Sequence, residues 1–211
     1  MGIRKLLILT AFVAASSLLP SRAQESERPL FSPLDRPRVA SPDGEWLVTV
    51  WGAKTDAWLM LEGKDGTPQI QVWPIFASCT ILWKPDSTAF AIVDARFSNH
   101  QFLLVNFIRG YKSSEQVDLS PVLERRLRAS VPPDYDLDKI YVKPLQWLPG
   151  GRLLVGSLGV TYKKRNFPGD WPGVSRYFGY IVDPDKRQIL RGLSKDEVLK
   201  EYHINLEEGW W

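Results

Sequence analysis

Few residues in this chain have the type and spacing that catalysis requires. The two histidines, His100 and His203, lie in neither a metal-spaced motif nor a nucleophile motif. Ser157 stands in Gly156-Ser157-Leu158-Gly159, which lacks the glycine two residues before the serine that a nucleophile elbow needs. We therefore interpret Ser157 as a strand serine, and the sequence favours a protein that is not an enzyme, with no catalytic residue assigned.

Three aspartates alternate along the chain at positions 134, 136 and 138, a spacing that suggests a calcium loop. Such a loop also needs glycine and glutamate at fixed later positions, here 139 and 145. Lys139 and Leu145 stand there instead. The segment is better explained as a polar linker, and we predict no metal and no cofactor.

The best local candidate for ligand binding is the segment 163–173. It begins with three cations and continues through turn-forming residues to an aromatic, and its candidate binding residues are Lys163, Lys164, Arg165, Phe167 and Trp171. A long loop between two strands is expected to project from the scaffold. An exposed aromatic beside cations can hold a sugar ring, a peptide or an anionic group. The alternative is that Trp171 folds back to pin the loop.

Other large side chains are expected in the core. Six tryptophans fall in or beside predicted strands, where their rings most simply fill the space between sheets: Trp46, Trp51, Trp58, Trp73, Trp83 and Trp147. Cys79, the only cysteine, alternates with Ile81 and Trp83 and is expected to be a small core residue. A single cysteine cannot form a disulfide within the chain, so stability must come from packing.

The first 23 residues have the order of a cleavable secretory signal peptide. A cationic start with Arg4 and Lys5 precedes an apolar run over 6–19, and Ser21 and Ala23 provide small residues before a cut at Gln24. The apolar run is shorter than the roughly 20 residues that span a bilayer. We expect an extracytoplasmic protein, periplasmic or secreted, without stable membrane insertion after cleavage.

Loss of the signal peptide removes the excess positive charge. The precursor has 27 basic and 24 acidic residues, and the signal peptide contains three of the basic residues and no acidic one. The mature chain therefore carries 24 of each. Because bulk attraction to polyanions depends on net positive charge, neither nucleic acid nor an anionic membrane is an expected partner.

A turn motif recurs along the chain and marks internal repeats. Ser41-Pro42-Asp43-Gly44 is followed by an apolar strand, as are Lys84-Pro85-Asp86-Ser87 and, more loosely, Leu148-Pro149-Gly150-Gly151. Proline presets the first turn position, aspartate bonds nearby backbone, and glycine accepts positive φ. Each copy is therefore predicted to be a tight turn that feeds a strand.

The same order of elements surrounds each turn and predicts three units of four strands, at about 36–76, 77–119 and 140–193, within one domain, 36–211, that follows a linker at 24–35. The predicted strands are 36–40, 45–51, 57–63 and 69–75, then 79–84, 88–94, 101–108 and 114–118, then 140–148, 151–160, 176–183 and 187–193. The second strand of each unit is apolar at consecutive positions, which is typical of strands buried on both faces.

Two short helices are predicted after the second and third units. The first runs over 120–129, with Ser120 as N-cap and Pro121 in its first turn. The second runs over 194–202, where Ser194 and Glu197 have the spacing of a capping box. Both are expected to cover sheet faces.

With these turns the chain resembles the Ser-Pro-Asp-Gly β-propeller repeats of the periplasmic TolB proteins and of prolyl-oligopeptidase-like enzymes. The first turn matches the repeat fully, the second has serine for glycine, and the third has lost the aspartate. The resemblance covers most of 36–193 and implies propeller-like blades and often a protein-binding role. It carries no peptidase activity, because no residues remain for a hydrolase domain.

The sequence thus predicts an all-β fold of three four-stranded antiparallel propeller-like blades with two short helices, the alternative being a β-sandwich or meander. Because three blades do not ordinarily close a ring, the outer faces must be capped or must meet another molecule. We expect a non-catalytic binding or scaffold protein that acts through protein contact or self-association. The alternative is a glycan- or small-ligand-binding protein that uses the loop 163–173.

Overall fold

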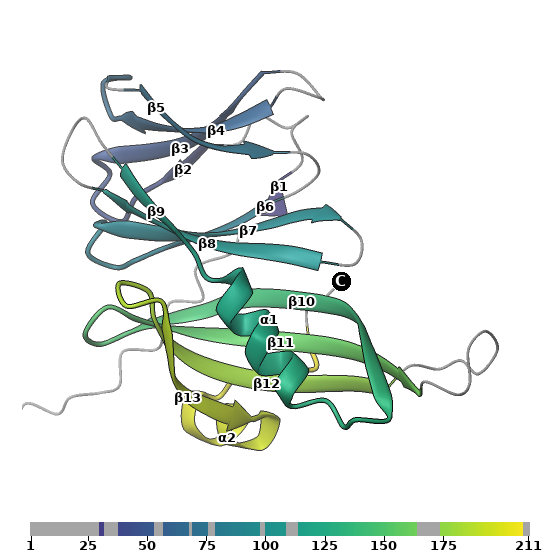
Figure 1. The fold of residues 1–211 in the computed structure, drawn as a ribbon. Helices are drawn as coiled ribbons and strands as arrows, with labels where there is room; N and C mark the ends of the chain where they lie inside the picture. Colours follow the sequence, from purple (N-terminus) through teal and green to yellow (C-terminus); the bar gives the residue numbers. More distant parts are fainter. Residues whose placement is uncertain are drawn as a thin grey trace, which may run out of the picture.

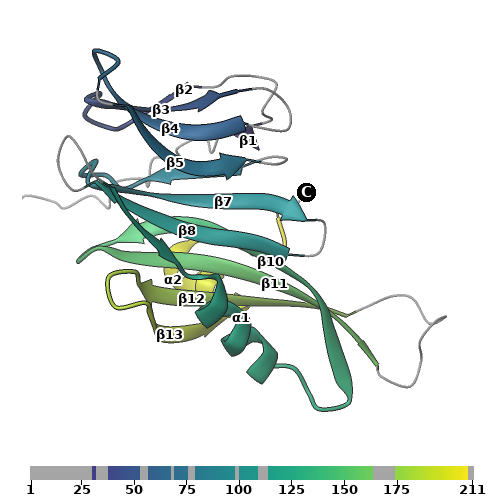
Figure 2. The same ribbon diagram turned by 45° about the horizontal axis from the view of Figure 1, so that its top comes forward.

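Three antiparallel sheets, each of four strands, form most of the structure, together with two short helices (Figure 1). The computed structural model describes residues 30–31, 38–52, 57–67, 69–75, 79–97, 100–108, 114–163 and 174–208. The all-β fold and its three four-stranded sheets, predicted from the repeated turns, are confirmed. The sheets are layered one on another (Figures 1 and 2), which gives one layer more than a two-sheet sandwich has.

Each sheet is a meander whose strands follow one another in sequence. The first sheet contains β2 (Arg38–Ala40), β3 (Trp46–Trp51), β4 (Ala57–Gly63) and β5 (Gln69–Ile75). The second sheet contains β6 (Cys79–Trp83), β7 (Ala89–Phe97), β8 (His100–Ile108) and β9 (Ser114–Asp118). The third sheet contains β10 (Tyr135–Leu148), β11 (Arg152–Lys163), β12 (Val174–Asp183) and β13 (Gln188–Ser194).

Two further pairings connect these units. Strand β1 (Leu30–Phe31), which falls in the segment expected to be a linker, pairs antiparallel with β6. One parallel pair, Ile140 opposite His100, joins β10 to β8. Hydrogen bonding therefore runs edge to edge from β1 through the second sheet into the third, while the first sheet is separate.

The repeated turns have the conformation that their residues dictate. In the first turn, Gly44 has φ +73° and its N–H donates to the Ser41 carbonyl at 2.9 Å. In the second turn, Ser87 takes the same place with φ +60°, and its N–H donates to the Lys84 carbonyl at 2.9 Å. The Asp43 N–H donates to Ser87 Oγ at 3.1 Å, so the two turns lie side by side. The aligned turns place successive sheets in register.

Two apolar cores fill the spaces between the three sheets. One lies between the first and second sheets and includes Val48, Leu59 and Phe90. The other lies between the second and third sheets and includes Ala91 and Leu153. Because neighbouring side chains on a strand point to opposite faces, Phe90 and Ala91 belong to different cores. Strand β7 is therefore buried on both faces, as its consecutive apolar residues predict.

Helix α2 (Lys195–Tyr202) covers the face of the third sheet that points away from the second sheet. Ser194 and Glu197 form the predicted capping box, in which the Glu197 N–H donates to Ser194 Oγ at 3.2 Å. Val198 is fully buried against Leu154 and Ile181. The predicted covering role of this helix is confirmed.

Helix α1 (Ser120–Ala129) packs Leu123 and Leu127 into the core between the second and third sheets. Its N-cap residue is Leu119, so the prediction of Ser120 as N-cap is wrong. The Ser120 hydroxyl instead accepts the Leu103 N–H at 2.9 Å, which ties the start of the helix to strand β8. Within the described residues, neither helix is long and apolar enough to cross a membrane.

Candidate functional site

The predicted ligand loop lies almost wholly outside the described residues. Lys164, Arg165, Phe167 and Trp171 are not among them, and Lys163 is the last residue of strand β11. The binding role assigned to this loop remains a prediction. A different surface emerges from the part of the chain that the structure describes.

This surface is the face of the first sheet that points away from the second sheet, which we call the outer face. In Figure 1 the first sheet forms the top layer, α2 lies at the opposite end of the stack, and α1 runs alongside the third sheet. The third sheet has α2 as a cap, whereas among the described residues no helix covers the first sheet. Among the described residues, a helix therefore caps the stack at one end only.

Alternation along the strands determines which side chains belong to the outer face. Val39, Val48 and Leu61 point into the core, so their neighbours point outward. The outer face therefore contains Arg38, Ala40, Leu47, Thr49, Trp51, Trp58, Met60, Glu62 and Gln71. Trp51 has 49% of its surface exposed, and Trp58 is partly exposed. The expectation that both tryptophans fill the core is wrong, because no further sheet packs on this side.

A hydrogen-bond network crosses the outer face from β3 to β4. Glu62 Oε1 accepts from Thr49 Oγ1 at 2.8 Å and from Trp51 Nε1 at 2.6 Å. Trp51 Nε1 is also 3.1 Å from Thr49 Oγ1. The indole therefore leans along the sheet to reach Glu62, which leaves its ring both anchored and half exposed.

The charges on the outer face are few and close together. Glu62 is only 7% exposed, and its two donors, Thr49 and Trp51, are both neutral. Arg38 is exposed and lies opposite Thr49 in the β2–β3 pairing. A carboxylate that is mostly removed from water is stabilised by a nearby cation. The outer face thus presents one acid and one base on either side of Thr49.

The other four strand tryptophans occupy the core positions that were predicted. Trp46 and Trp147 are buried, and Trp73 and Trp83 pack against the core between the first and second sheets. Trp147 Nε1 donates to the Leu82 carbonyl at 3.2 Å, a bond between the third and second sheets. These rings hold the layers together and do not form a binding surface.

The residues that the sequence offered as candidates for catalysis or metal binding lie in strands or at the end of a helix. Ser157 is a buried strand residue, as predicted. Asp136 and Asp138 are exposed and belong to strand β10, which begins at Tyr135, so the interpretation of this segment as a linker is wrong. No group of acidic, histidine or cysteine side chains among the described residues could hold a metal ion. His203 ends α2 in the left-handed conformation, with φ +58°.

Cys79 is a buried core thiol, as predicted, and its reactivity can be tested directly. Burial, with a smaller contribution from the charge of Asp94, raises the pKa of Cys79 to about 12. Because the thiolate is the reactive form, we expect the folded protein to react with a disulfide reagent such as dithionitrobenzoate at least about 100-fold more slowly than the unfolded chain. The measurement is thionitrobenzoate release with and without guanidinium. Rapid release from the folded protein would contradict a buried thiol.

The single cysteine makes that measurement unambiguous.

Comparisons with protein-family models, with curated proteins and with solved structures found no match to this chain.

Proposed function

We propose that this chain is an exported, non-catalytic scaffold protein that associates with a second copy of itself through the outer face of the first sheet. The observation that carries this proposal is the sheet face that no described helix caps, with the half-exposed Trp51 at the end of β3. Exposed contiguous apolar surface rimmed by polar residues is typical of interaction sites. We include in this proposal a relationship to the TolB-type propeller repeats, in which the faces of neighbouring sheets pack against one another.

The pattern of charge favours a second copy as the partner. In a two-fold symmetric contact the same surface meets itself, so every charge must find its opposite on that surface. Arg38 and Glu62 lie on opposite sides of Thr49. A two-fold rotation can therefore bring Arg38 of one copy toward Glu62 of the other, which supplies the cation that each carboxylate lacks.

The size of the outer face sets the expected affinity. Four strands about 4.8 Å apart, each up to seven residues long with about 3.3 Å per residue, give a face of roughly 400 Å². Stable complexes bury about 800 Å² on each partner. We therefore expect a weak, reversible dimer with a dissociation constant of micromolar order or higher.

Light scattering of the purified protein over a dilution series tests this proposal. The mass is expected to rise from that of one chain toward that of two as concentration increases. Replacing Trp51 by alanine, or Arg38 by glutamate, is expected to weaken dimerisation at least about ten-fold, because the first removes the exposed ring and the second makes both charges acidic. Both residues are exposed, so both variants should fold.

Leu199→Ala is the matched control. Leu199 is 50% exposed, almost the same as Trp51, but lies on α2 at the capped end of the stack. This variant should dimerise like the unaltered protein. A strictly monomeric protein at all concentrations, or an equal loss of mass in the Leu199 variant, would contradict the proposal.

Export is tested on the same sample. The proposal places the working protein outside the cytoplasm after a cut between Ala23 and Gln24. Intact-mass measurement of protein recovered from the expressing cell is expected to show a chain that starts at Gln24. Recovery only of the uncut chain, from the cytoplasm, would count against export without affecting the test of self-association.

A further inference from the structure

A small pocket lies between helix α1 and the edge strand β13, in the third sheet and away from the outer face. It has a volume of about 240 Å³ and is lined by Arg126, Ile189, Leu190, Arg191 and Gly192. An engineered cavity of about 150 Å³ binds benzene, and pockets for drug-sized ligands begin near 300 Å³. The pocket volume is therefore suited to a group about as large as one amino-acid residue.

A β-bulge shapes the pocket wall. Ile181 pairs with Arg191 and Val182 pairs with Ile189, so Leu190 is an extra residue in β13. Such a residue is left out of the ladder and re-aims its neighbours. As a result Ile189 packs toward the core on the α1 side, and Leu190 is 45% exposed at the pocket. The pocket wall thus combines apolar side chains with the edge of a sheet.

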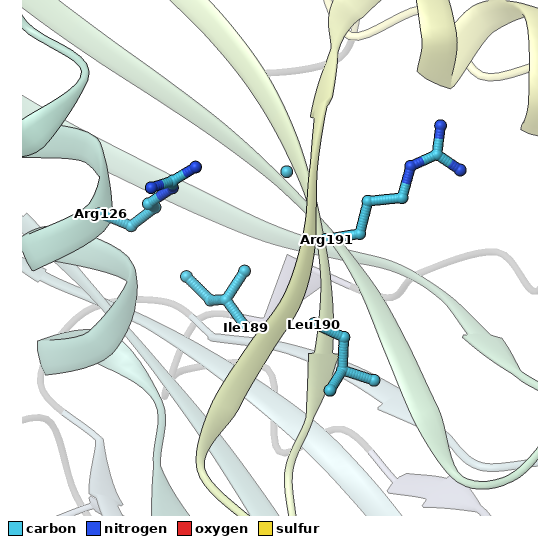
Figure 3. Close-up of a pocket in the computed structure, with 5 residues that line it drawn as sticks. Arg126, Ile189, Leu190 and Arg191 are labelled. Carbon is cyan, nitrogen blue, oxygen red and sulfur yellow. The ribbon is translucent and has the colours of Figure 1, made fainter.

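The two arginines of the pocket differ in their partners. Figure 3 shows Arg126 reaching from α1 toward β13, with Arg191 on the other side of that strand. The Arg191 guanidinium bonds Glu201 at 2.7 Å and Glu197 at 3.1 Å on α2, and these two carboxylates balance its charge. On α1, Glu124 pairs with Arg128 at 2.8 Å. Among the described residues no carboxylate pairs with Arg126.

A buried tyrosine lies next to the pocket. Tyr180 is 2% exposed, and its hydroxyl is removed from solvent. A Cβ atom built at Gly192 would lie at ordinary contact distance from both Arg126 Nη2 (3.7 Å) and Tyr180 Cε1 (3.9 Å), so Arg126 and the Tyr180 ring lie beside the same residue of β13. Burial raises the pKa of Tyr180 to about 12, against the opposing effects of the Arg126 charge and of a hydrogen bond with Ser130. The hydroxyl therefore stays uncharged at neutral pH and leaves the charge of Arg126 unbalanced.

We propose that this pocket binds the carboxylate of a small ligand that also carries an apolar group. The Arg126 guanidinium provides the charge-assisted hydrogen bonds that a carboxylate accepts. Ile189 and Leu190 provide contact for the apolar part. A monoanion suits a site with one unbalanced cation.

Titration of the isotopically labelled full-length mature protein with N-acetyl-leucine, followed by NMR chemical shifts, tests the site. We expect saturable shifts at millimolar ligand for backbone amides of β13 and the C-terminal half of α1. N-acetyl-leucinamide, which has the same apolar group without the charge, should bind at least about ten-fold more weakly, because hydrogen bonds to charged groups are the stronger ones. Inorganic phosphate, which lacks the apolar group, should also bind more weakly.

One variant and a matched control assign the effect to a named residue. Arg126→Gln is expected to weaken N-acetyl-leucine binding about ten-fold. Arg125→Gln removes the same charge from the adjacent position of the same helix, outside the pocket lining, and should leave binding unchanged. Both variants can be checked for folding by their unshifted amide spectra far from the pocket.

The outcomes separate the proposal from general attraction between charges. If the Arg125 and Arg126 variants lost equal affinity for N-acetyl-leucine, the effect would come from the net charge of the helix, and the proposed site would be wrong. Equal binding of the acid and its amide, equal binding of phosphate, or no saturable shift at about 10 mM ligand would also overturn it. None of these results bears on dimerisation through the outer face, which lies on another sheet.

Discussion

Replacing Phe90 by alanine is expected to destabilise the protein by about 3–5 kcal/mol, the usual cost of removing a fully buried aromatic ring. Phe90 has no exposed surface, and its ring centroid is 4.7 Å from that of Trp83 in a tilted contact. It lies on β7, the strand that borders both cores. Because a small domain is stable by only about 5–15 kcal/mol, the variant should be folded marginally or not at all.

Urea unfolding measures this effect. The midpoint should fall sharply, with an unchanged slope if all three sheets still unfold together. Leu199→Ala, a truncation at a half-exposed site, is the comparison and should change stability by less than about 0.5 kcal/mol. A separate transition for the first sheet in the Phe90 variant would show that the layers do not unfold as one unit.

Replacing Gly179 by alanine is expected to cost about 3 kcal/mol, at the upper end for overpacking. A Cβ atom built at Gly179 would meet Val198 Cγ2 well inside contact distance and Leu193 Cβ at 3.2 Å. The χ1 angle of valine is stiff in a helix, so the methyl group cannot simply rotate away. The whole of α2 must shift, and the third sheet would lose part of its cap.

A double-mutant cycle identifies the cause. Val198→Ala removes the clashing methyl and should by itself cost about 2 kcal/mol for lost burial. In the double variant the alanine at position 179 should cost little more, which gives a coupling energy of about 2–3 kcal/mol. Additive losses in urea unfolding would mean that the contact between Gly179 and Val198 is not what restricts position 179.

The layered fold could be predicted because its determinants are local. Each turn is specified by proline, aspartate and a residue that tolerates positive φ, and the strands that follow lie within the same unit. Thus the bounds predicted for β4 and β9 agree with the structure. The start of β10 was missed by five residues, since its alternating aspartates are exposed in a strand and look like a linker.

The position of the outer face could not be predicted from the apolar pattern alone. Leu47 and Trp51 are as apolar as the core residues between them, and which face of a strand is covered depends on what packs there. A signal was nevertheless present in Thr49 and Glu62, polar residues that alternate with the buried positions of β3 and β4. Two polar residues at these outward positions indicate a face that is not part of the apolar core, although both side chains are buried in their own hydrogen-bond network.

The pocket at β13 had no local signal. It depends on an extra residue at Leu190 and on the approach of Arg126 from a helix more than 60 residues earlier in the chain. Its charge balance depends in turn on Glu197 and Glu201 pairing with Arg191 rather than with Arg126. Such a site follows from tertiary packing, which residue spacing does not encode.

The cap of α2 on the third sheet also limits how far copies of the chain can assemble. A stack with two open ends could add copies head to tail without limit and grow into a filament, because such heterologous contacts need not close. With Val198 filling one end, only the end with Trp51 remains open among the described residues. In the proposed dimer, association through that end would stop at two copies, and this short helix would prevent further polymerisation.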